Sequence, residues 1–240
     1  MGMQAAVQLV YPPQCLSCDA LVTTDFGLCA RCWRETPFIA GLVCDCCGTP
    51  LPGEEGGAPV QCDDCLTIAR PWGRGRAVML YRDNARRLVM ALKHGDRLDL
   101  ARPGAQWLHR AAAPLLQPDT LLAPVPLHWL RLFRRRYNQS ALLAAGLARL
   151  ADLPHCPDLL VRRRNTRSQE GRDREGRFRN LEEAIRVNER RRWQMEGLPV
   201  LLVDDVMTSG ATLGACADAC LAAGAARVDV VVLARVAKDG

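Results

Sequence analysis

The residues best suited to chemistry lie in one stretch, Val200–Leu213, which reads VLLVDDVMTSGATL. Its apolar start predicts a buried strand, and two adjacent carboxylates, Asp204 and Asp205, come at the strand's end. A small-residue turn then leads into a helix; it consists of Thr208, Ser209, Gly210, Ala211 and Thr212. Such a helix N-terminus binds anions, because its first N–H groups lack partners within the helix and the helix dipole is positive there. Since carboxylates bind hydroxyls or a metal ion, the pattern indicates a site that can hold both ends of a phosphorylated sugar.

A second reactive set lies near the N-terminus, where nine of the twelve cysteines precede residue 66. Eight of them form four Cys-x-x-Cys pairs: Cys15 and Cys18, Cys29 and Cys32, Cys44 and Cys47, and Cys62 and Cys65. Two such pairs complete a tetrahedral Zn²⁺ shell, so the eight thiolates suit two structural zinc ions. Pairing the first with the second and the third with the fourth is the simplest arrangement, and a cross-braced arrangement is compatible with the same spacing.

Other uses of these thiols fit the sequence less well. Disulfides need an oxidising compartment, of which the chain gives no sign. Thioredoxin-like chemistry would use one Cys-x-x-Cys pair and not four, and an iron–sulfur cluster could use the same thiolates. We therefore favour zinc, in a module that folds only with its metal and serves structure or partner binding. The remaining cysteines are interpreted as small buried residues; they are Cys46, Cys156, Cys216 and Cys220.

The rest of the chain must supply a scaffold that positions the acidic pair and the turn. We expect strands at 77–81, 121–125, 159–161, 200–203 and 228–234, and helices at 84–94, 98–113, 138–150 and 213–223. Strands that alternate with helices predict an α/β fold with a mostly parallel sheet covered on both faces, whose ligands bind at the C-terminal ends of the strands. The predicted domains are a cysteine-rich module at 1–70 and the sheet domain at 71–240.

Composition narrows the class of protein. With 24% charged and 49% hydrophobic residues the chain can bury a core. No apolar run approaches the ~20 residues of a membrane span, and signals for secretion or myristoylation are missing, so we expect a cytoplasmic protein without membrane insertion. The net charge of +6 is concentrated in residues 162–192, which contain twelve arginines and six acidic residues. Such a block binds phosphate or nucleic acid, or is simply a solvated segment.

The stretch Val200–Leu213 resembles the phosphoribosyl pyrophosphate (PRPP) motif of type I phosphoribosyltransferases. The resemblance implies that Asp204 and Asp205 hold the ribose 2′- and 3′-hydroxyls, and that residues 208–212 bind the 5′-phosphate. It also implies a type I phosphoribosyltransferase-like fold, with Mg²⁺ bridging the pyrophosphate and the ribose. In the reaction of that family, a nucleophile displaces pyrophosphate from C1 of PRPP.

Two further segments resemble the ComF family, and with the cysteine pairs the likeness covers nearly the whole chain. In Ala123–Ala144 a Pro-x-Pro turn precedes the matching residues Arg135, Tyr137, Asn138 and Gln139, while Arg136 replaces the family's glycine. We interpret this segment as a pyrophosphate loop containing Val125, Pro126, Leu127, Arg131 and Arg135. The other segment matches the family at Arg162, Thr166, Gln169, Arg177 and Asn180. We interpret it as a flexible lid over a charged substrate, and a plain surface loop would look the same.

The resemblance implies a protein that binds PRPP or another phosphoribosyl ligand with Mg²⁺ and acts in natural competence, the uptake of single-stranded DNA. We predict a phosphoribosyltransferase of unknown acceptor, and the sequence leaves open whether turnover occurs. The alternatives are a non-catalytic competence factor that binds single-stranded DNA, and a zinc-ribbon adaptor for competence or DNA-processing proteins. Lys93 and His94, near the end of a predicted helix, receive no role.

Overall fold

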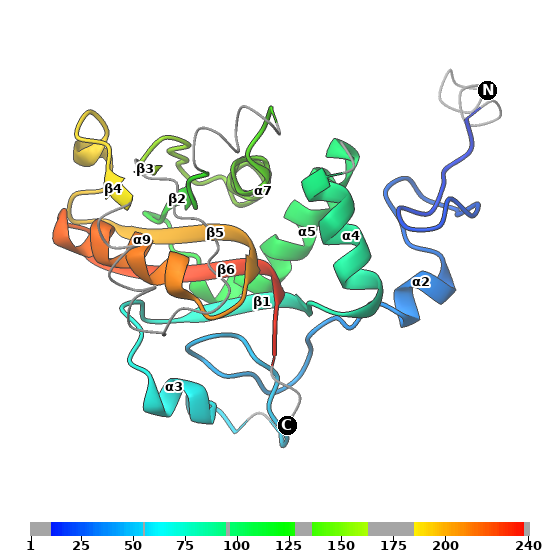
Figure 1. Cartoon of the computed structure of the whole chain (residues 1–240), viewed down its shortest axis with the longest axis horizontal. Coiled ribbons are helices and arrows are strands. Elements are labelled where there is room, and N and C mark those ends of the chain that lie inside the picture. The colour runs from blue at the N-terminus through cyan, green and yellow to red at the C-terminus, as the bar shows by residue number, and fades with distance from the viewer. Residues whose placement is uncertain (1–10, 55, 95–96, 128–135, 163–184, 238–240) are drawn as a thin grey trace, which may run out of the picture.

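A computed structural model describes residues 11–54, 56–94, 97–127, 136–162 and 185–237. Its centre is a parallel sheet with the strand order β1-β6-β5-β2 (Figure 1). The strands are β1 (Gly75–Leu80), β2 (Leu121–Pro124), β5 (Pro199–Met207) and β6 (Arg227–Arg235). A separate antiparallel pair consists of β3 (Leu160–Arg162) and β4 (Ile185–Val187). The predicted α/β fold with a mostly parallel sheet is confirmed.

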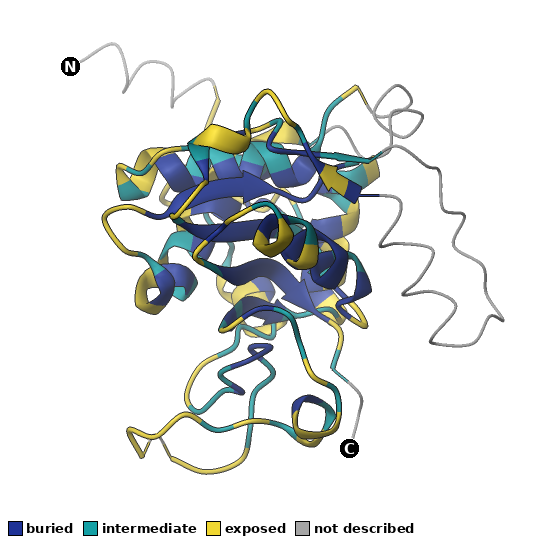
Figure 2. Cartoon of the chain, turned by 90° about the vertical axis from the view of Figure 1, so that its left-hand side faces the viewer, coloured by how far each residue is buried: buried dark blue, intermediate teal, exposed yellow. Residues whose placement is uncertain are grey.

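Most residues of the two central strands, β5 and β6, are apolar because both faces of the sheet are covered. Successive side chains point to opposite faces, so Val200 and Leu202 join one core cluster while Leu201 and Val203 join the other. Figure 2 shows these buried strands between helices whose outer sides are exposed.

Three helices contribute to the cluster on one face: α4 (Asp83–His94), α5 (Ala101–Ala112) and α7 (Gln139–Ala151). The opposite face is covered by α9 (Ala211–Ala222), which buries Leu213, Cys216 and Cys220. Short 3₁₀ turns lie at Leu98–Leu100, Ala113–Leu115 and Arg192–Gln194. Among the described residues, no helix combines the length and the apolar character that crossing a membrane requires.

The cysteine-rich module contains two short helices, α2 (Ala30–Arg34) and α3 (Asp63–Thr67), which lie well apart (Figure 1). We call residues 15–32 the first ribbon and residues 44–65 the second ribbon. The first ribbon lies beside α4 and α5, where Asn84 Nδ2 donates to the carbonyl of Cys32 at 3.2 Å. The second ribbon packs into the core cluster that contains α9. The division of the chain at residue 70 remains a prediction.

The element boundaries differ from expectation in three places. Strand β5 does not end at residue 203 but continues to Met207, because it stays paired with β6 as far as Met207 opposite Arg235. The helix expected at 98–113 begins as a 3₁₀ turn, and α5 starts at Ala101 with Pro103 in its first turn, where a missing N–H is tolerated. Strand β4 was not predicted, since its three residues include the exposed Arg186 and are too short to show a period.

Candidate functional site

The acidic pair lies at the C-terminal edge of the sheet but inside strand β5. Strand β2 ends where Pro124 pairs with Val203, so Asp204 and the residues after it in β5 extend beyond the end of β2. Asp204 is partly buried and Asp205 is buried. Parallel sheets bind ligands at this edge, so the two carboxylates have the expected position even though they belong to the strand.

Each carboxylate has a defined partner. The hydroxyl of Ser140 donates to Asp204 Oδ1 at 2.8 Å, and the backbone N–H of Asp205 donates to the same oxygen at 2.8 Å. Lys93 Nζ lies 2.9 Å from Asp205 Oδ1, in an ion pair whose side chains are 20% and 11% exposed. Because both charges are largely withdrawn from water, the pair is screened less than an ion pair on the surface.

The carboxyl of Asp204 is held as a weak acid. Burial, and secondly the neighbouring charge of Asp205, raise its pKa to about 7. The hydrogen bonds from Ser140 and from the backbone, together with the charge of Lys93, act in the opposite direction. The ligand-free site therefore holds two carboxyls of which one is readily protonated near neutral pH.

The 208–212 turn follows the acidic pair and lines a small hollow of about 50 Å³ together with Asp204. Gly210 has a φ of +80°, which glycine adopts without strain, and α9 begins at the next residue. Within the described chain, the backbone N–H groups of Thr208, Ser209 and Gly210 have no acceptor. The turn therefore offers three unpaired donors next to a helix N-terminus, which is the arrangement that binds phosphate.

The buried guanidinium of Arg235 fixes the orientation of this turn from behind. Its Nη1 donates to the carbonyls of Thr208 and Val236, the latter at 2.9 Å, and lies 3.4 Å from the carbonyl of Met207. In a planar trans peptide the C=O and the next N–H point in opposite directions. Holding the carbonyls of Met207 and Thr208 toward Arg235 therefore turns the N–H groups of Thr208 and Ser209 away from it.

The start of α7 connects the helix that carries Lys93 with the loop after β2. Tyr137 donates its hydroxyl to the carbonyl of Leu92 at 2.8 Å, and Gln139 Nε2 donates to the carbonyl of Lys93 at 3.3 Å. Asn138 Nδ2 donates to the carbonyl of Val125 at 3.0 Å, while Asn138 Oδ1 accepts from the N–H of Ser140 as the helix cap. These side chains thus position Lys93 and Ser140 without touching the acidic pair themselves.

Lys93 and Ser140 were not identified from the sequence as site residues. Ser140 looks like any serine at the start of a helix, and nothing in the sequence indicates that it contacts a carboxylate 64 positions away. For Lys93 a compositional signal was present, because only two of the 32 basic residues are lysines. A lysine in a chain that otherwise uses arginine marks a place where a compact charge fits better than a planar guanidinium.

The predicted pyrophosphate loop is only partly described. The N–H of Val125 donates to the carbonyl of Val203 at 3.0 Å, so it is not free for a ligand, and Pro126 has no N–H. Leu127 is left as the described backbone donor of this loop, and Arg131 and Arg135 lie outside the described residues. Of the predicted lid, Arg162 ends β3, whereas Thr166, Gln169, Arg177 and Asn180 lie outside the described residues.

Arg136, which replaces the glycine of the ComF pattern, has a φ of +63°. This left-handed conformation costs a residue with a Cβ about 1–2 kcal/mol. We expect Arg136→Gly to leave the stability within about 0.5 kcal/mol, since relief of strain offsets the greater freedom of glycine in the unfolded chain. We expect Arg136→Val to destabilise by about 1–2 kcal/mol, because a β-branched side chain tolerates this conformation poorly. Urea unfolding of both variants measures the difference, and equal midpoints would contradict the expectation.

The eight predicted ligands form two groups of four, Cys15, Cys18, Cys29 and Cys32, and Cys44, Cys47, Cys62 and Cys65. In each group all sulfur atoms lie within 4.8 Å of one another. The Sγ atoms of Cys18 and Cys29 are 3.6 Å apart and those of Cys47 and Cys62 are 3.7 Å apart. A tetrahedron with Zn–S bonds of 2.3 Å has edges of about 3.8 Å, so both groups fit zinc with sequential pairing. The other four cysteines are buried, as predicted.

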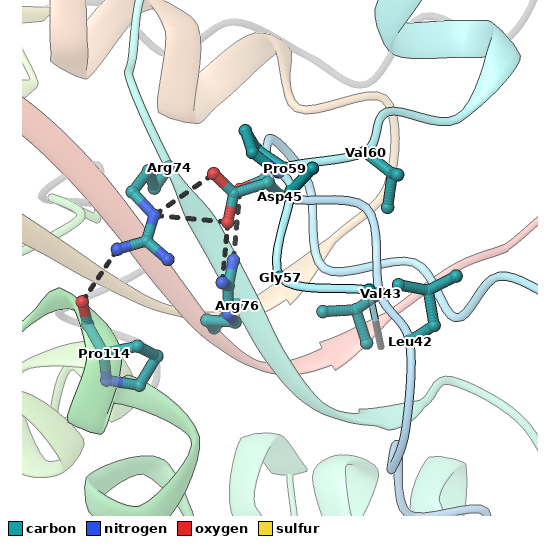
Figure 3. A pocket seen from close by; sticks show the side chains of 11 residues that line it. Leu42, Val43, Asp45, Gly57, Pro59, Val60, Arg74, Arg76 and Pro114 are labelled. Carbon is teal, nitrogen blue, oxygen red and sulfur yellow. Dashed lines mark hydrogen bonds and ion pairs between the residues drawn. The ribbon is translucent and has the colours of Figure 1, made fainter. Parts of the chain in front are cut away.

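A larger hollow, of about 580 Å³, lies between the second ribbon and the start of β1 (Figure 3). Asp45 faces Arg74 and Arg76 there, with a shortest contact of 2.7 Å to Arg76 Nη2, and Arg74 Nη1 donates to the carbonyl of Pro114 at 2.9 Å. Both arginines already have an anionic partner in Asp45, which offsets one of their two charges. The hollow also lies at the N-terminal end of β1. We therefore assign the chemistry to the opposite edge of the sheet, although the hollow beside the 208–212 turn is smaller.

Known proteins resemble the chain along most of its length. Residues 6–66 match the double zinc ribbon domain family, and residues 138–240 match the phosphoribosyl transferase domain family. The chain is 33% identical to DNA utilization protein YhgH of Salmonella typhimurium, over 95% of this chain and 99% of that protein. It is 28% identical to competence protein F of Haemophilus influenzae, with 83% and 87% covered. Competence protein ComFC of Bacillus subtilis is 27% identical, with 83% and 85% covered. The chain therefore belongs to the ComF family and joins a double zinc ribbon to a phosphoribosyltransferase domain.

Proposed function

We propose that the chain binds PRPP, or another phosphoribosyl ligand, at the C-terminal edge of its sheet and transfers the phosphoribosyl group to an acceptor. The observation that carries the proposal is the adjacency of two kinds of group on one segment. Asp204 and Asp205 offer carboxylate oxygens, and three to six residues later the 208–212 turn offers three N–H groups without an acceptor in the described chain. A sugar phosphate has hydroxyls for the former and an anion for the latter.

In this proposal the 5′-phosphate lies on the turn, and the ribose hydroxyls donate to the two carboxylates. The phosphate gains from the N-terminus of α9 and from N–H groups that Arg235 has already oriented, so little ordering is left to be done on binding. The Lys93 ammonium offsets one of the two adjacent negative charges while no ligand is present. This lowers the electrostatic cost of keeping two acids side by side.

The donors present also suit Mg²⁺, which prefers carboxylate, hydroxyl and phosphate oxygens. When bound with the ligand, Mg²⁺ would neutralise charge on the pyrophosphate. Asp204 and Asp205 would contribute oxygens on the ribose side and stabilise positive charge that develops at C1 as the bond to pyrophosphate breaks. No general base is required of these side chains, because positioning and charge stabilisation supply the main effects. We likewise propose that each Cys₄ group holds one structural zinc ion.

Titration calorimetry with PRPP and Mg²⁺ tests the site. We expect Asp205→Asn to weaken binding about 10- to 100-fold, because a hydrogen bond to a charged acceptor contributes about 1.5–3 kcal/mol. Asp99→Asn is the matched control, since it removes a more exposed carboxylate that pairs with Arg97 and not with Lys93. Equal affinities for the wild type and both variants, or no binding by any of them, would refute the site.

A pyrophosphate-release assay with PRPP and a panel of nucleobases separates catalysis from binding. Release that depends on one acceptor identifies a transferase, whereas PRPP binding without release favours a non-catalytic role. The relatives are named for DNA utilization and competence, and we propose that this chain serves a DNA-related pathway as well.

A further inference from the structure

The segment that follows the second ribbon contacts the 208–212 turn, and an arginine makes its hydrogen bond. Arg70, five residues after Cys65, donates from Nη1 to the carbonyl of Ser209 at 2.6 Å. The two residues are 139 positions apart in the sequence. Arg70 forms no ion pair with the described residues, so no described carboxylate neutralises its charge.

Trp72 connects this arginine to the second ribbon. The guanidinium of Arg70 lies over the indole of Trp72, 5.4 Å from the ring centre. Trp72 is buried, and its Nε1 donates at 2.7 Å to the carbonyl of Cys46, which lies between the zinc ligands Cys44 and Cys47. Arg70 thus packs on Trp72, and Trp72 is in turn anchored to the metal-binding loop through the carbonyl of Cys46.

The contact with the turn is close enough to require glycine. A Cβ at Gly210 would lie 2.9 Å from Arg70 Nη1 and 2.9 Å from the indole of Trp72, which is shorter than real Cβ contacts. Gly210 therefore serves two purposes. It allows the positive φ, and it lets Arg70 and Trp72 pack against the turn.

The direction of the Arg70 contact matters for anion binding. The carbonyl of Ser209 and the N–H of Gly210 belong to one planar trans peptide and point in opposite directions. With the carbonyl held by Arg70, the Gly210 N–H is directed away from the ribbon, just as Arg235 directs the N–H groups of Thr208 and Ser209. Two arginines that are far apart in the sequence, Arg70 and Arg235, thus orient three consecutive donors.

The first ribbon has a different location. Its described contacts go to α4, α5 and the segment between them: Asn84 bonds the carbonyl of Cys32, and Arg97 Nη2 donates to the carbonyl of Leu16 at 3.4 Å. No described residue of the first ribbon forms a hydrogen bond with the 208–212 turn.

We propose that Arg70 is a positioning residue for the 208–212 turn, and that through Arg70 and Trp72 the second ribbon, unlike the first, is part of the phosphoribosyl site. The inference rests on the proposed function, because the turn is taken to hold the ligand's phosphate. Arg70 acts by orienting the turn and by adding a positive charge close to it.

Two measurements on Arg70→Ala test this, with Arg97→Ala as the matched control that removes an arginine–carbonyl contact of the first ribbon. Calorimetry with ribose 5-phosphate is expected to show about 10- to 100-fold weaker binding for Arg70→Ala and wild-type binding for Arg97→Ala. Arg70→Lys, which retains a charged donor, is expected to restore most of the affinity. Hydrogen exchange of the backbone amides at 206–213 is expected to be faster in Arg70→Ala than in the control. Zinc content, measured in every variant, is expected to stay at the wild-type value.

The outcomes separate this inference from the proposed function. Equal ribose 5-phosphate affinity and equal exchange in Arg70→Ala and Arg97→Ala would overturn the role of Arg70. If the wild type itself binds no ribose 5-phosphate, the proposed function fails, and the exchange rates alone decide whether Arg70 orients the turn. If Arg70→Ala loses zinc, Arg70→Gln, which keeps most of the side-chain volume, takes its place in both measurements.

Discussion

Asp204→Asn is expected to stabilise the ligand-free protein at pH 8 and to weaken its binding of PRPP. Burial and the charge of Asp205 raise the pKa of Asp204 to about 7 in the folded chain, from 3.8. Below pH 4 the carboxyl is protonated in both the folded and the unfolded chain, and the shift costs nothing. Between pH 4 and pH 7 only the unfolded chain ionises, so stability falls as the pH rises and the full cost is present above pH 7.

The cost removed by asparagine is at most about 4 kcal/mol, since one pKa unit corresponds to 1.36 kcal/mol. Both donors to Asp204 use Oδ1, so the amide oxygen of asparagine can accept the same two hydrogen bonds. Urea unfolding at pH 8 and pH 5 measures the gain, which should be larger at pH 8. Asp158→Asn, which breaks a surface pair with Arg191, is the control. A gain that is equal at the two pH values would contradict the assignment of the raised pKa to Asp204.

The same variant tests the ligand. A ribose hydroxyl donates to an ionised carboxylate more strongly than to a neutral amide, so the affinity of Asp204→Asn for PRPP should fall. The wild-type affinity should rise between pH 6 and pH 8 as Asp204 ionises, and this component should be missing in the variant. A variant that is both more stable and unable to bind PRPP would show that the charge of Asp204 destabilises the folded protein but is needed for ligand binding.

Cys47→Ser is expected to lose one zinc ion and to destabilise the sheet domain as well as the second ribbon. Cys47 is fully buried and shares a core cluster with Met207 of β5 and Leu213 of α9. Structural zinc contributes about 10–16 kcal/mol to the folding of isolated zinc-finger peptides. Even a small part of this energy is a large share of the ~5–15 kcal/mol that stabilises a typical protein.

Cys29→Ser, in the first ribbon, is the matched variant. It should also lose one zinc ion, but its effect on the sheet domain should be smaller. The first ribbon contributes Leu16 to one core cluster, whereas the second ribbon contributes four buried residues to the other, Cys44, Cys46, Cys47 and Cys65. Metal analysis and thermal unfolding of both variants give the comparison. Two retained zinc ions in Cys47→Ser would disprove its role as a ligand, and equal thermal shifts in the two variants would disprove the closer coupling of the second ribbon.

The fold was predictable because its signals are local. The apolar runs of β5 and β6 predicted buried strands, and the cysteine spacing predicted both Cys₄ groups. The contacts of the acidic pair were not local. Lys93 and Ser140 reach Asp205 and Asp204 from α4 and α7, and no sequence period records which helix end lies beside which strand.

The same reason explains the missed arginines. Arg235 lies in a mostly apolar strand and Arg70 in a short connection. The role of each depends on a contact with a carbonyl of the 208–212 turn, and that contact exists only in the folded chain. Val125 was assigned to the pyrophosphate loop from its place beside the Pro-x-Pro turn. In the structure its N–H donates to the carbonyl of Val203, since β2 and β5 continue to bond for one residue beyond the end of β2.

The position of β6 in the sheet has a consequence for how the protein is made. Strand β6 is the last described strand to leave the ribosome, yet it lies between β1 and β5 and is the only described strand that pairs with β1. Until it is synthesised, β1 has no partner in the sheet, and the second ribbon beside it cannot be brought against the 208–212 turn. The nascent chain therefore keeps the edge of β1 that pairs with β6 unpaired for more than a hundred residues of synthesis after β1, a condition under which chains aggregate and chaperones bind.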